Sequence, residues 1–311
     1  MKRGCGKRQS REIFMVSDNP GSRTLTLEPS DLPCTAALAA EVFAIGDVHG
    51  RAESLRACLH CIAAIPKQPG LERIVVFLGD LIDRGSDSLG AIETALDAKA
   101  LTGADECIIL PGNHELMLLE VLDGAEPQPW FRNGGKAVMQ QIDASWTEWP
   151  WHEIRRRLEA GLPEGFADMM RRAPSHVQLG DLLFVHAGLD PDRDDAAHLD
   201  RDRAMDDRHW ATIRNEALTW TGGWDRDPDT GARFRGPTVV VHGHTAAIRS
   251  DLAETAAEMP LMDAVDEHRA ICLDAGASIR PQVGWARFFS EAGTVKVQIF
   301  ATVTNPGPSR P

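Results

Sequence analysis

Aspartate, histidine and asparagine side chains recur in five short segments of the chain, each of which also contains glycine. The segments are GDVHG at 46–50, GDLIDRG at 79–85, GNHE at 112–115, HAG at 186–188 and GHT at 243–245. Carboxylate, imidazole and amide groups suit Mn, Fe or Zn, and the absence of cysteine from these segments argues against a closed structural zinc site. The residue types therefore predict a catalytic metal centre.

Two metal ions are expected, because one carboxylate that bridges two cations about 3.5–4 Å apart lets them clamp both oxygens of an in-line phosphoryl displacement. Asp80 is the expected bridge. Manganese is the first expectation for both ions, with Fe, Zn, Ni or Mg as alternatives. Taken singly, each segment has an ordinary interpretation, because Gly-Asp is common in turns and a lone histidine usually packs in a core. The five together indicate a metal site.

The polar segments follow short apolar runs that are rich in valine and isoleucine and predict strands. The first three runs, at 42–45, 74–78 and 107–110, alternate with helical patterns at 51–65 and 86–101. That alternation predicts βαβ units and a parallel sheet. Ligands of open α/β sheets bind beyond the carboxyl ends of the parallel strands, so the polar segments should meet there.

Later apolar runs predict strands at 182–185, 238–241, 271–273 and 295–299. These runs follow each other more closely, and the Gly-Asp pair at 180–181 stands between two apolar strands, as a hairpin turn would. An antiparallel element is therefore expected beside the parallel one. The residues predict a mixed α/β fold class with two sheets.

One large domain between two flexible ends is the predicted organisation. Residues 1–35 begin with a basic stretch and show little periodicity, which predicts a flexible arm, and NPGPSRP at 305–311 predicts a flexible tail. Residues 36–304 form the expected domain, with a helical, tryptophan-rich segment at about 114–173. The sequence assigns no role to the basic arm.

Composition and charge favour a globular protein that binds neither nucleic acid nor a membrane. The 311 residues are 43% hydrophobic, enough for a sizeable core, and their net charge of −13 repels polyanions. No secretory apolar region and no window of ~20 apolar residues is present, so a cytoplasmic location with reduced cysteines is expected. Cys58 and Cys61 are expected to be core thiols. Polar inserts at 190–208, expected to be a solvated loop that runs into a helix, and at 225–236 have no assigned role.

In this order the five segments resemble the calcineurin-like metallophosphoesterase superfamily, and most closely its PPP-type serine/threonine protein phosphatase branch, in the group that includes the bacteriophage lambda phosphatase. The resemblance runs from about residue 42 to residue 277 and includes WFRNGG at 130–135 and LDAGA at 273–277. It implies two mixed sheets in a sandwich flanked by helices. It also implies that a metal-activated hydroxide attacks phosphorus in line with a general acid.

The resemblance implies six metal ligands, one of them shared by both ions. The first ion is held by Asp47, His49 and Asp80, and the second by Asp80, Asn113, His186 and His244. His242 has the same strand parity as His244, so periodicity alone does not choose between them, and the resemblance picks His244. Many members of the wider superfamily carry a second histidine two positions after that GH pair, where this chain has Ala246, which fits the PPP branch.

The resemblance also implies roles for four residues that bind no metal. His114 is the expected general acid, Asp83 orients it, and Arg84 binds phosphate oxygens. Arginine suits phosphate because its planar fork binds two oxygens at once. A second phosphate-binding arginine is expected after the HAG segment, with Arg214 as the candidate and Arg208 near enough to compete.

Dephosphorylation of phosphoserine or phosphothreonine in proteins is the leading function that the resemblance implies. Symmetrical cleavage of diadenosine tetraphosphate is an alternative, since those hydrolases resemble the same branch. Trp146, Trp149 and Trp151 could stack on an adenine, although aromatic residues in helical segments more often pack in a core or cap. A metal-dependent scaffold that binds phosphorylated partners without turnover is a non-enzymic alternative. The expected partner is a phosphorylated protein or a small phosphorylated substrate, and the oligomeric state stays open.

Overall fold

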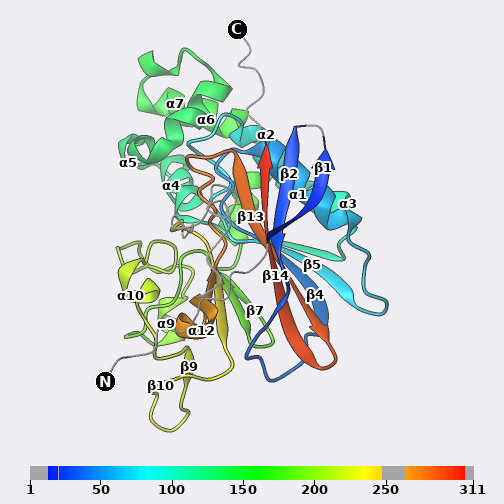
Figure 1. The fold of residues 1–311 in the computed structure, drawn as a ribbon. Helices are drawn as coiled ribbons and strands as arrows, with labels where there is room; N and C mark the ends of the chain where they lie inside the picture. Colours follow the sequence, from blue (N-terminus) through cyan, green and yellow to red (C-terminus); the bar gives the residue numbers. More distant parts are fainter. Residues whose placement is uncertain (1–12, 20, 247–263, 305–311) are drawn as a thin grey trace, which may run out of the picture.

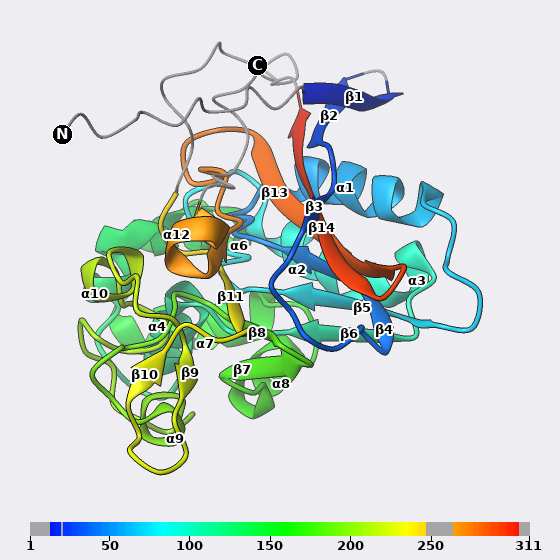
Figure 2. The same cartoon turned by 60° about the horizontal axis from the view of Figure 1, so that its bottom comes forward.

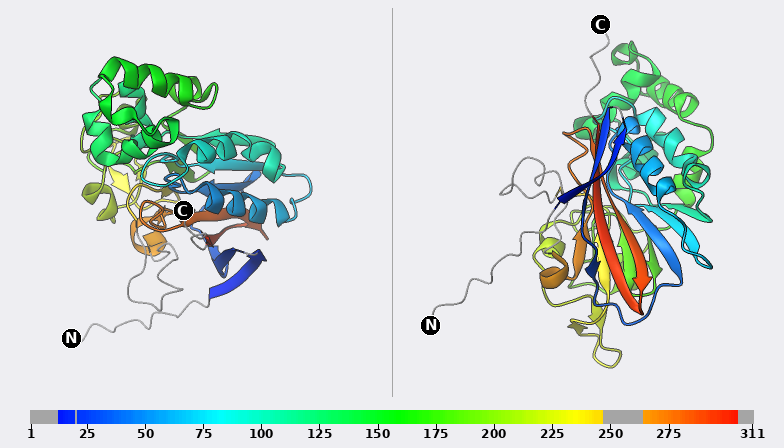
Figure 3. Two further views of the ribbon diagram at one scale, coloured as in Figure 1. Left: turned by 90° about the horizontal axis from the view of Figure 1, so that it is seen from above. Right: turned by 45° about the vertical axis from the view of Figure 1, so that its right-hand side comes forward.

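The fold is layered, as described by a computed structural model for residues 13–19, 21–246 and 264–304. Helices cover one face of an eight-stranded sheet, and a four-stranded sheet packs on its other face (Figures 1 and 3). An irregular segment with short helices covers the outer face of the smaller sheet. The predicted mixed α/β sandwich of two sheets is confirmed. No helix within the described ranges is long and apolar enough to cross a membrane.

The large sheet has the order β1-β2-β14-β13-β4-β5-β6, with β3 also paired to β14. Strands β4, β5 and β6 are parallel and the other pairs are antiparallel, so the predicted βαβ units are confirmed. The strand bounds are β1 (Ile13–Asn19), β2 (Ser22–Leu27), β3 (Ser30–Asp31), β4 (Ala40–Ile45), β5 (Glu72–Phe77), β6 (Glu106–Ile109), β13 (Gln282–Glu291) and β14 (Thr294–Thr304).

The small sheet has the order β12-β11-β8-β7, in which β8, β11 and β12 are parallel. Strand β7 pairs with β8 in the predicted antiparallel hairpin, and Gly180 turns it at a φ of 61°. The polar insert at 225–236 forms a separate hairpin, β9–β10, at the lower edge of the molecule in Figure 2. The bounds are β7 (His176–Leu179), β8 (Leu182–Val185), β9 (Asp225–Arg226), β10 (Arg233–Phe234), β11 (Val239–His242) and β12 (Ala270–Cys272).

Helices connect the parallel strands and fill the predicted helical segment at 114–173. The bounds are α1 (Ala52–Ala64), α2 (Ser88–Leu96), α3 (Ala98–Thr102), α4 (Asn113–Leu122), α5 (Gln128–Trp130), η1 (Phe131–Gly135), α6 (Lys136–Ile142), η2 (Trp146–Glu148), α7 (Trp151–Gly161), α8 (Phe166–Arg172), α9 (Asp195–His198), α10 (Asn215–Leu218) and α12 (Ala264–His268). The insert at 190–208 contains the short α9, so the predicted loop with a helix is present. Trp146 is buried in the helical core beside Phe131, whereas Trp151 is exposed.

Side chains of the central strands alternate between two cores. In β4, Phe43 and Ile45 pack on the helices, whereas Val42 and Ala44 pack between the sheets. Successive strand residues point to opposite faces, so a strand buried on both faces is apolar throughout. The continuous apolar runs in the sequence have this origin. They place the carboxyl ends of the strands firmly between two packed layers.

The predicted flexible arm at 1–35 is wrong for the part that the structure describes. Strand β2 lies along the edge of β14, from the Thr26–Phe300 pair to the Ser22–Thr304 pair. Its Leu25 and Leu27 are buried in the core between the sheets, which orders this segment. The domain therefore begins before residue 36. Residues 1–12 and the predicted tail at 305–311 lie outside the described residues.

Candidate metal centre

Five strand ends bring the polar segments together at one edge of the sandwich. The segments follow β4, β5, β6, β8 and β11, and the structure thereby assembles the six predicted metal ligands in one place. Two motif glycines permit this approach. A Cβ atom at Gly112 would lie 2.1 Å from Oδ1 of Asp80, and one at Gly243 would lie 2.1 Å from Oδ1 of Asp47. Side chains at those positions would displace the carboxylates.

Backbone strain is concentrated at the same place. Seven non-glycine residues in the described ranges have a positive φ, and five of them belong to the predicted site. These five are His49, Asp80, Asp83, Arg84 and His244. A positive φ costs on the order of 1–3 kcal/mol for a non-glycine residue and persists where the surroundings over-determine it. Such clustering is typical of functional regions.

The carboxylate of Asp80 lies at the centre of the cluster. Its Oδ2 atom is 3.6 Å from Nε2 of His49 and 3.4 Å from Nε2 of His186. Its Oδ1 atom accepts a hydrogen bond from the backbone N–H of His114. Oδ2 therefore faces imidazoles of both predicted metal positions, as a bridging ligand would. Two candidate metal-binding groups among the described residues share Asp80: one with His49 and His114, the other with His186 and His244.

Asp47 provides a direct test of whether the residues fit a cation. Its Oδ1 atom accepts the backbone N–H of His244, but its fully buried Oδ2 has no hydrogen-bond partner within the described chain. A buried carboxylate oxygen without a donor is costly unless a cation neutralises it. That Oδ2 lies 3.7 Å from Nε2 of His49. The two donor atoms are placed to share a metal ion, so the residues fit the expected group.

Backbone carbonyls orient the histidine rings. Nδ1 of His49 is 3.0 Å from the carbonyl of Ile82, and Nδ1 of His186 is 2.8 Å from that of Leu78. A ring whose Nδ1–H is used in this way presents a bare Nε2 to a metal. For His244 the roles are reversed, because its Nε2 contacts the carbonyl of Thr212 and its Nδ1 has no hydrogen-bond partner among the described residues. The ligand tautomers are thus set by the surrounding backbone.

The buried carboxylates give the cluster an excess of negative charge, which a cation would neutralise. Burial, with the neighbouring Asp274 and Asp80, raises the pKa of Asp47 well above its ordinary value. Burial alone would lower the pKa of His186, but Asp80 and Asp47 outweigh it and raise this pKa to about 9. In the absence of metal, a proton on His186 therefore supplies the charge. Asn113 completes this side, with Oδ1 3.2 Å from Nε2 of His186.

Glu115 and Asp274 were not among the residues singled out from the sequence. Glu115 is fully buried, and its carboxylate accepts the backbone N–H groups of Asp80, Leu81 and Gly112 at 2.8 Å each. It therefore clamps the loop that carries the bridging ligand to the start of α4. A glutamate three residues after a helix N-cap is a sequence signal for such a contact. Asp274 adds a buried negative charge, and it belongs to the LDAGA segment that the resemblance includes, although no role was assigned to it there.

The predicted acid and its partner are in direct contact. Nδ1 of His114 is 2.6 Å from Oδ2 of Asp83, and both side chains are buried. Nε2 of His114 lies 3.9 Å from Oδ2 of Asp80 and 3.3 Å from a terminal nitrogen of Arg84. Burial lowers the pKa of His114, but the carboxylates of Asp80 and Asp83 outweigh it and raise the pKa above its ordinary value. The ring can thus carry a proton toward the metal cluster.

Of the two competing arginines, Arg214 is the one beside the cluster. Its guanidinium donates to Oγ1 of Thr245, which follows His244 in the chain. Arg208 instead forms ion pairs with Asp190 and Asp192. His242, the histidine left out of the predicted ligand set, is buried with its Nδ1 near the carbonyl of Gly243.

Comparison with known proteins assigns the family. The model of the calcineurin-like phosphoesterase family matches residues 40–256, which contain all five polar segments. The chain belongs to this family. It is therefore a hydrolase of the metallophosphoesterase type, and the resemblance seen in the sequence is confirmed.

Relatives of this phosphoesterase include proteins named as protein phosphatases and as dinucleoside tetraphosphatases. Serine/threonine-protein phosphatase 2 of Escherichia coli is 31% identical over 94 residues, which cover 30% of this chain and 38% of that protein. The chain thus matches about two fifths of the length of that relative. The asymmetrical bis(5′-nucleosyl)-tetraphosphatase PrpE of Bacillus subtilis is 27% identical over 259 residues, covering 81% of this chain and 92% of that protein. A serine/threonine phosphatase structure from Saccharomyces cerevisiae has 15% identity and a TM-score of 0.42, covering 87% of this chain and 82% of that one.

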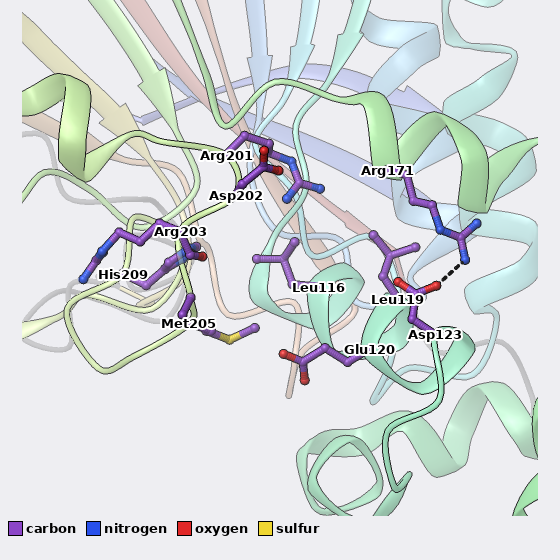
Figure 4. A pocket seen from close by; sticks show the side chains of 11 residues that line it. Leu116, Leu119, Glu120, Asp123, Arg171, Arg201, Asp202, Arg203, Met205 and His209 are labelled. Atoms are coloured by element: carbon purple, nitrogen blue, oxygen red, sulfur yellow. Dashed lines mark hydrogen bonds and ion pairs between the residues drawn. The ribbon is translucent and has the colours of Figure 1, made fainter.

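A cleft of about 330 Å³ lies along helix α4 of the phosphoesterase (Figure 4). Leu116 and Glu120 line it and share one helical face with Asn113, because the spacing is three and four residues. With a rise of about 1.5 Å per residue, Glu120 lies about 10 Å along the axis from Asn113. Arg171, one of the cleft arginines, is paired with Asp123, whereas no ion pair engages Glu120 within the described residues.

Proposed function

We propose that this phosphoesterase removes phosphate from serine and threonine side chains of proteins with two divalent cations. The observation that carries the proposal is the contact of His114 with Asp83 beside the Asp80 carboxylate. A serine or threonine phosphate expels a strongly basic alkoxide, which needs a proton donor at the reacting centre. A buried, carboxylate-backed imidazole supplies that donor.

The distances within the cluster support the proposed metal ligands. Asp47, His49 and Asp80 would hold one ion, and Asp80, Asn113, His186 and His244 would hold the other. When bound, the two ions lower the pKa of a water molecule and polarise the phosphoryl oxygens. Manganese remains the first expectation for both. Glu115 fixes the position of the Asp80 carboxylate, because it accepts the backbone N–H groups of Asp80 and Leu81.

The arginines would bind the phosphate oxygens from two sides. Arg84 reaches the Nε2 side of His114, so a phosphate held there lies next to the acid. Arg214 is anchored through Thr245 beside His244 on the other side of the cluster. The two guanidinium groups supply local positive charge in a protein whose net charge of −13 repels the substrate at long range.

The cleft along α4 supports a peptide substrate. An extended chain spans ~3.3–3.6 Å per residue, so the ~10 Å from Asn113 to Glu120 corresponds to about three residues of peptide. Glu120 lines the cleft with a carboxylate that no ion pair engages among the described residues, whereas Asp202 on the lining interacts with the neighbouring Arg201. A lysine or arginine about three residues from the phosphoserine would complement Glu120. The cleft thus gives the substrate a second contact beyond the phosphate.

Two measurements test the proposal. The first compares kcat/KM for phosphoserine peptides and for dinucleoside tetraphosphates, since that ratio defines substrate discrimination. A higher value for the peptides is expected. The second measures His114→Asn on a series of alkyl and aryl phosphates. We expect a loss of about 10²–10⁴-fold on alkyl esters and a much smaller loss on nitrophenyl phosphate, whose phenolate needs little protonation. Equal losses across the series with metals retained would exclude the general-acid role.

Hydrolysis of dinucleoside tetraphosphates is the second candidate. It is favoured by one observation, the similarity to the Bacillus subtilis tetraphosphatase over 81% of this chain. That relative is named for asymmetrical cleavage, whereas the resemblance in the sequence favours symmetrical cleavage as the alternative. A higher kcat/KM on the tetraphosphate than on any phosphopeptide would establish this candidate. The nucleotide products would then distinguish the two modes of cleavage.

A further inference from the structure

We infer that Trp130 is a positioning residue of the catalytic machinery, because its indole N–H holds the Asp83 carboxylate that in turn holds His114. The inference rests on the proposed function, since it assigns Trp130 to the general acid of that reaction. Trp130 belongs to the WFRNGG segment at 130–135, and neither metal binding nor phosphate binding uses this residue.

The single indole N–H of Trp130 makes a bifurcated hydrogen bond to both oxygens of the Asp83 carboxylate. Nε1 of Trp130 lies 2.8 Å from Oδ2 and 3.1 Å from Oδ1 of Asp83. Oδ2 also faces Nδ1 of His114 at 2.6 Å, whereas Oδ1 has the indole as its sole hydrogen-bond donor among the described residues. The carboxylate is fully buried, so water does not replace a lost donor. Without the indole N–H, the carboxylate could rotate and move Oδ2 away from the imidazole.

The indole is itself held rigidly. Trp130 is 1% exposed, and a Cβ atom at Gly135 would lie 2.2 Å from Cε2 of its ring. The glycine therefore lets the backbone lie directly against the ring. The ring of Phe131 also packs against Trp130, with 5.5 Å between the two ring centroids. Because the ring cannot move, its N–H holds the carboxylate of Asp83 in one orientation.

The same segment also holds the phosphate-binding arginine. The carbonyl of Asn133 accepts Nε of Arg84 at 3.2 Å, and the carbonyl of Gly134 accepts the Arg84 backbone N–H at 3.3 Å. Gly134 has a φ of 118°, and a Cβ atom there would lie 2.6 Å from Cγ of Arg84. One short segment thus fixes Asp83 and Arg84, which are neighbours in the chain. Proper alignment of acid and phosphate is worth large factors in rate because misplacement by ~1 Å is costly.

A purely structural role is the alternative, and a matched tryptophan in the same protein separates the two. Trp285 is also fully buried and lies opposite Ile45 of β4 in the sheet. It donates its indole N–H to Oγ1 of Thr302 in β14 at 2.9 Å, so this hydrogen bond engages none of the polar segments. Trp130→Phe and Trp285→Phe each delete one buried indole hydrogen bond. Replacement of Trp130 by 3-benzothienylalanine keeps the size of the ring and removes only the N–H donor.

The experiment measures kcat, KM and bound metal for these variants and for His114→Asn on a series of phosphate esters with leaving groups of different pKa. For Trp130→Phe and for the benzothienyl variant we expect about a tenfold fall in kcat on alkyl phosphates, a fall of less than about threefold on nitrophenyl phosphate, and unchanged metal content. Trp285→Phe should keep the parental dependence on leaving group. A benzothienyl variant with the parental dependence, or with equal losses on all esters, overturns the inference. If the loss of kcat caused by His114→Asn is the same for all esters, His114 is not the general acid. That result would contradict the proposed function itself, whatever the Trp130 variants show.

Discussion

Nε2 of His186 lies 3.4 Å from Oδ2 of Asp80 in a fully buried environment. Burial alone would lower the pKa of this imidazole, but Asp80 and Asp47 raise it to about 9. At neutral pH the metal-free protein therefore holds a proton where a cation would bind. The ligand form of histidine is neutral, so a metal ion must expel that proton.

Metal binding should consequently release protons and strengthen with rising pH. Between about pH 6.5 and 8.5 we expect the Mn²⁺ affinity to rise by at least about tenfold per pH unit, levelling off above about pH 9, because His186 is protonated below that value. Calorimetry in buffers of different ionisation enthalpy measures the released protons. His242→Gln is the control, since burial lowers the pKa of His242 to about 4 and this ring is already neutral. Binding without proton release at pH 7 would contradict the prediction.

Asp80→Asn should weaken both metal ions together. The substitution keeps the shape of the side chain but removes the charge that faces His49 and His186 from one oxygen. Metal analysis after dialysis and the turnover of an aryl phosphate measure the effect. Asp87→Asn is the matched control, because Asp87 is the N-cap of α2, a role that asparagine also fills. Retention of two tightly bound ions and a near-normal rate in Asp80→Asn would exclude the bridge.

Arg84→Lys should slow catalysis without changing the metal content. Lysine keeps the positive charge but loses the planar fork that binds two phosphate oxygens, so we expect kcat/KM to fall by about 10–100-fold. Arg214→Lys should show a loss of the same kind. Arg208→Lys is the control, since Arg208 is paired with Asp190 and Asp192, and its kcat/KM should stay within about twofold of the parent enzyme. The reverse order of effects would assign the second phosphate contact to Arg208.

Glu120→Lys should change which peptides are good substrates. The exchange puts a positive charge into the cleft of about 330 Å³ beside α4. For phosphopeptides with arginine or lysine three residues from the phosphoserine, kcat/KM should fall about fivefold at low salt and less at high salt. Neutral phosphopeptides and nitrophenyl phosphate should be unaffected. Glu126→Lys, at an exposed position outside the cleft, is the control for the change in overall charge. An equal fall in kcat/KM for that variant would show that the peptide does not bind in the cleft.

Glu41→Ala should destabilise the fold rather than the site. Glu41 is fully buried in β4, and its carboxylate binds Arg73 of β5 and Arg287 of β13 at 2.9 and 2.5 Å. Removing it leaves two arginines without their partner, which should cost about 3–5 kcal/mol in the free energy of unfolding. Asp31→Ala, at the exposed pair with Lys296, should cost less than about 1 kcal/mol. Urea denaturation measures both, and a loss below 1 kcal/mol for Glu41→Ala would contradict the prediction.

The strand pattern of the sequence predicted where the metal ligands would gather, because the polar segments follow buried strands. The full ligand set, including the choice of His244 over His242, came from the resemblance to the superfamily. A strand packed on both faces shows in the sequence as an apolar run, and its end is the place where polar side chains can meet. Asp47, Asp80 and Asn113 are marked in this way by local pattern. The βαβ alternation then predicts that their strand ends lie side by side, which β4, β5 and β6 confirm.

The tertiary structure decided everything that depends on which distant segments meet. Strand β2 is ordered by its pairing with β14, which lies more than 270 residues later in the chain. Its own mixed composition gives no sign of that pairing, and the sequence therefore predicted a flexible arm. The proposal of Arg214 rather than Arg208 rests on a contact with Thr245 that no spacing encodes. Trp130 reaches Asp83 across 47 residues. Local sequence sets the direction of a side chain along its own strand or helix, whereas the partner it finds depends on how the layers pack over the whole chain.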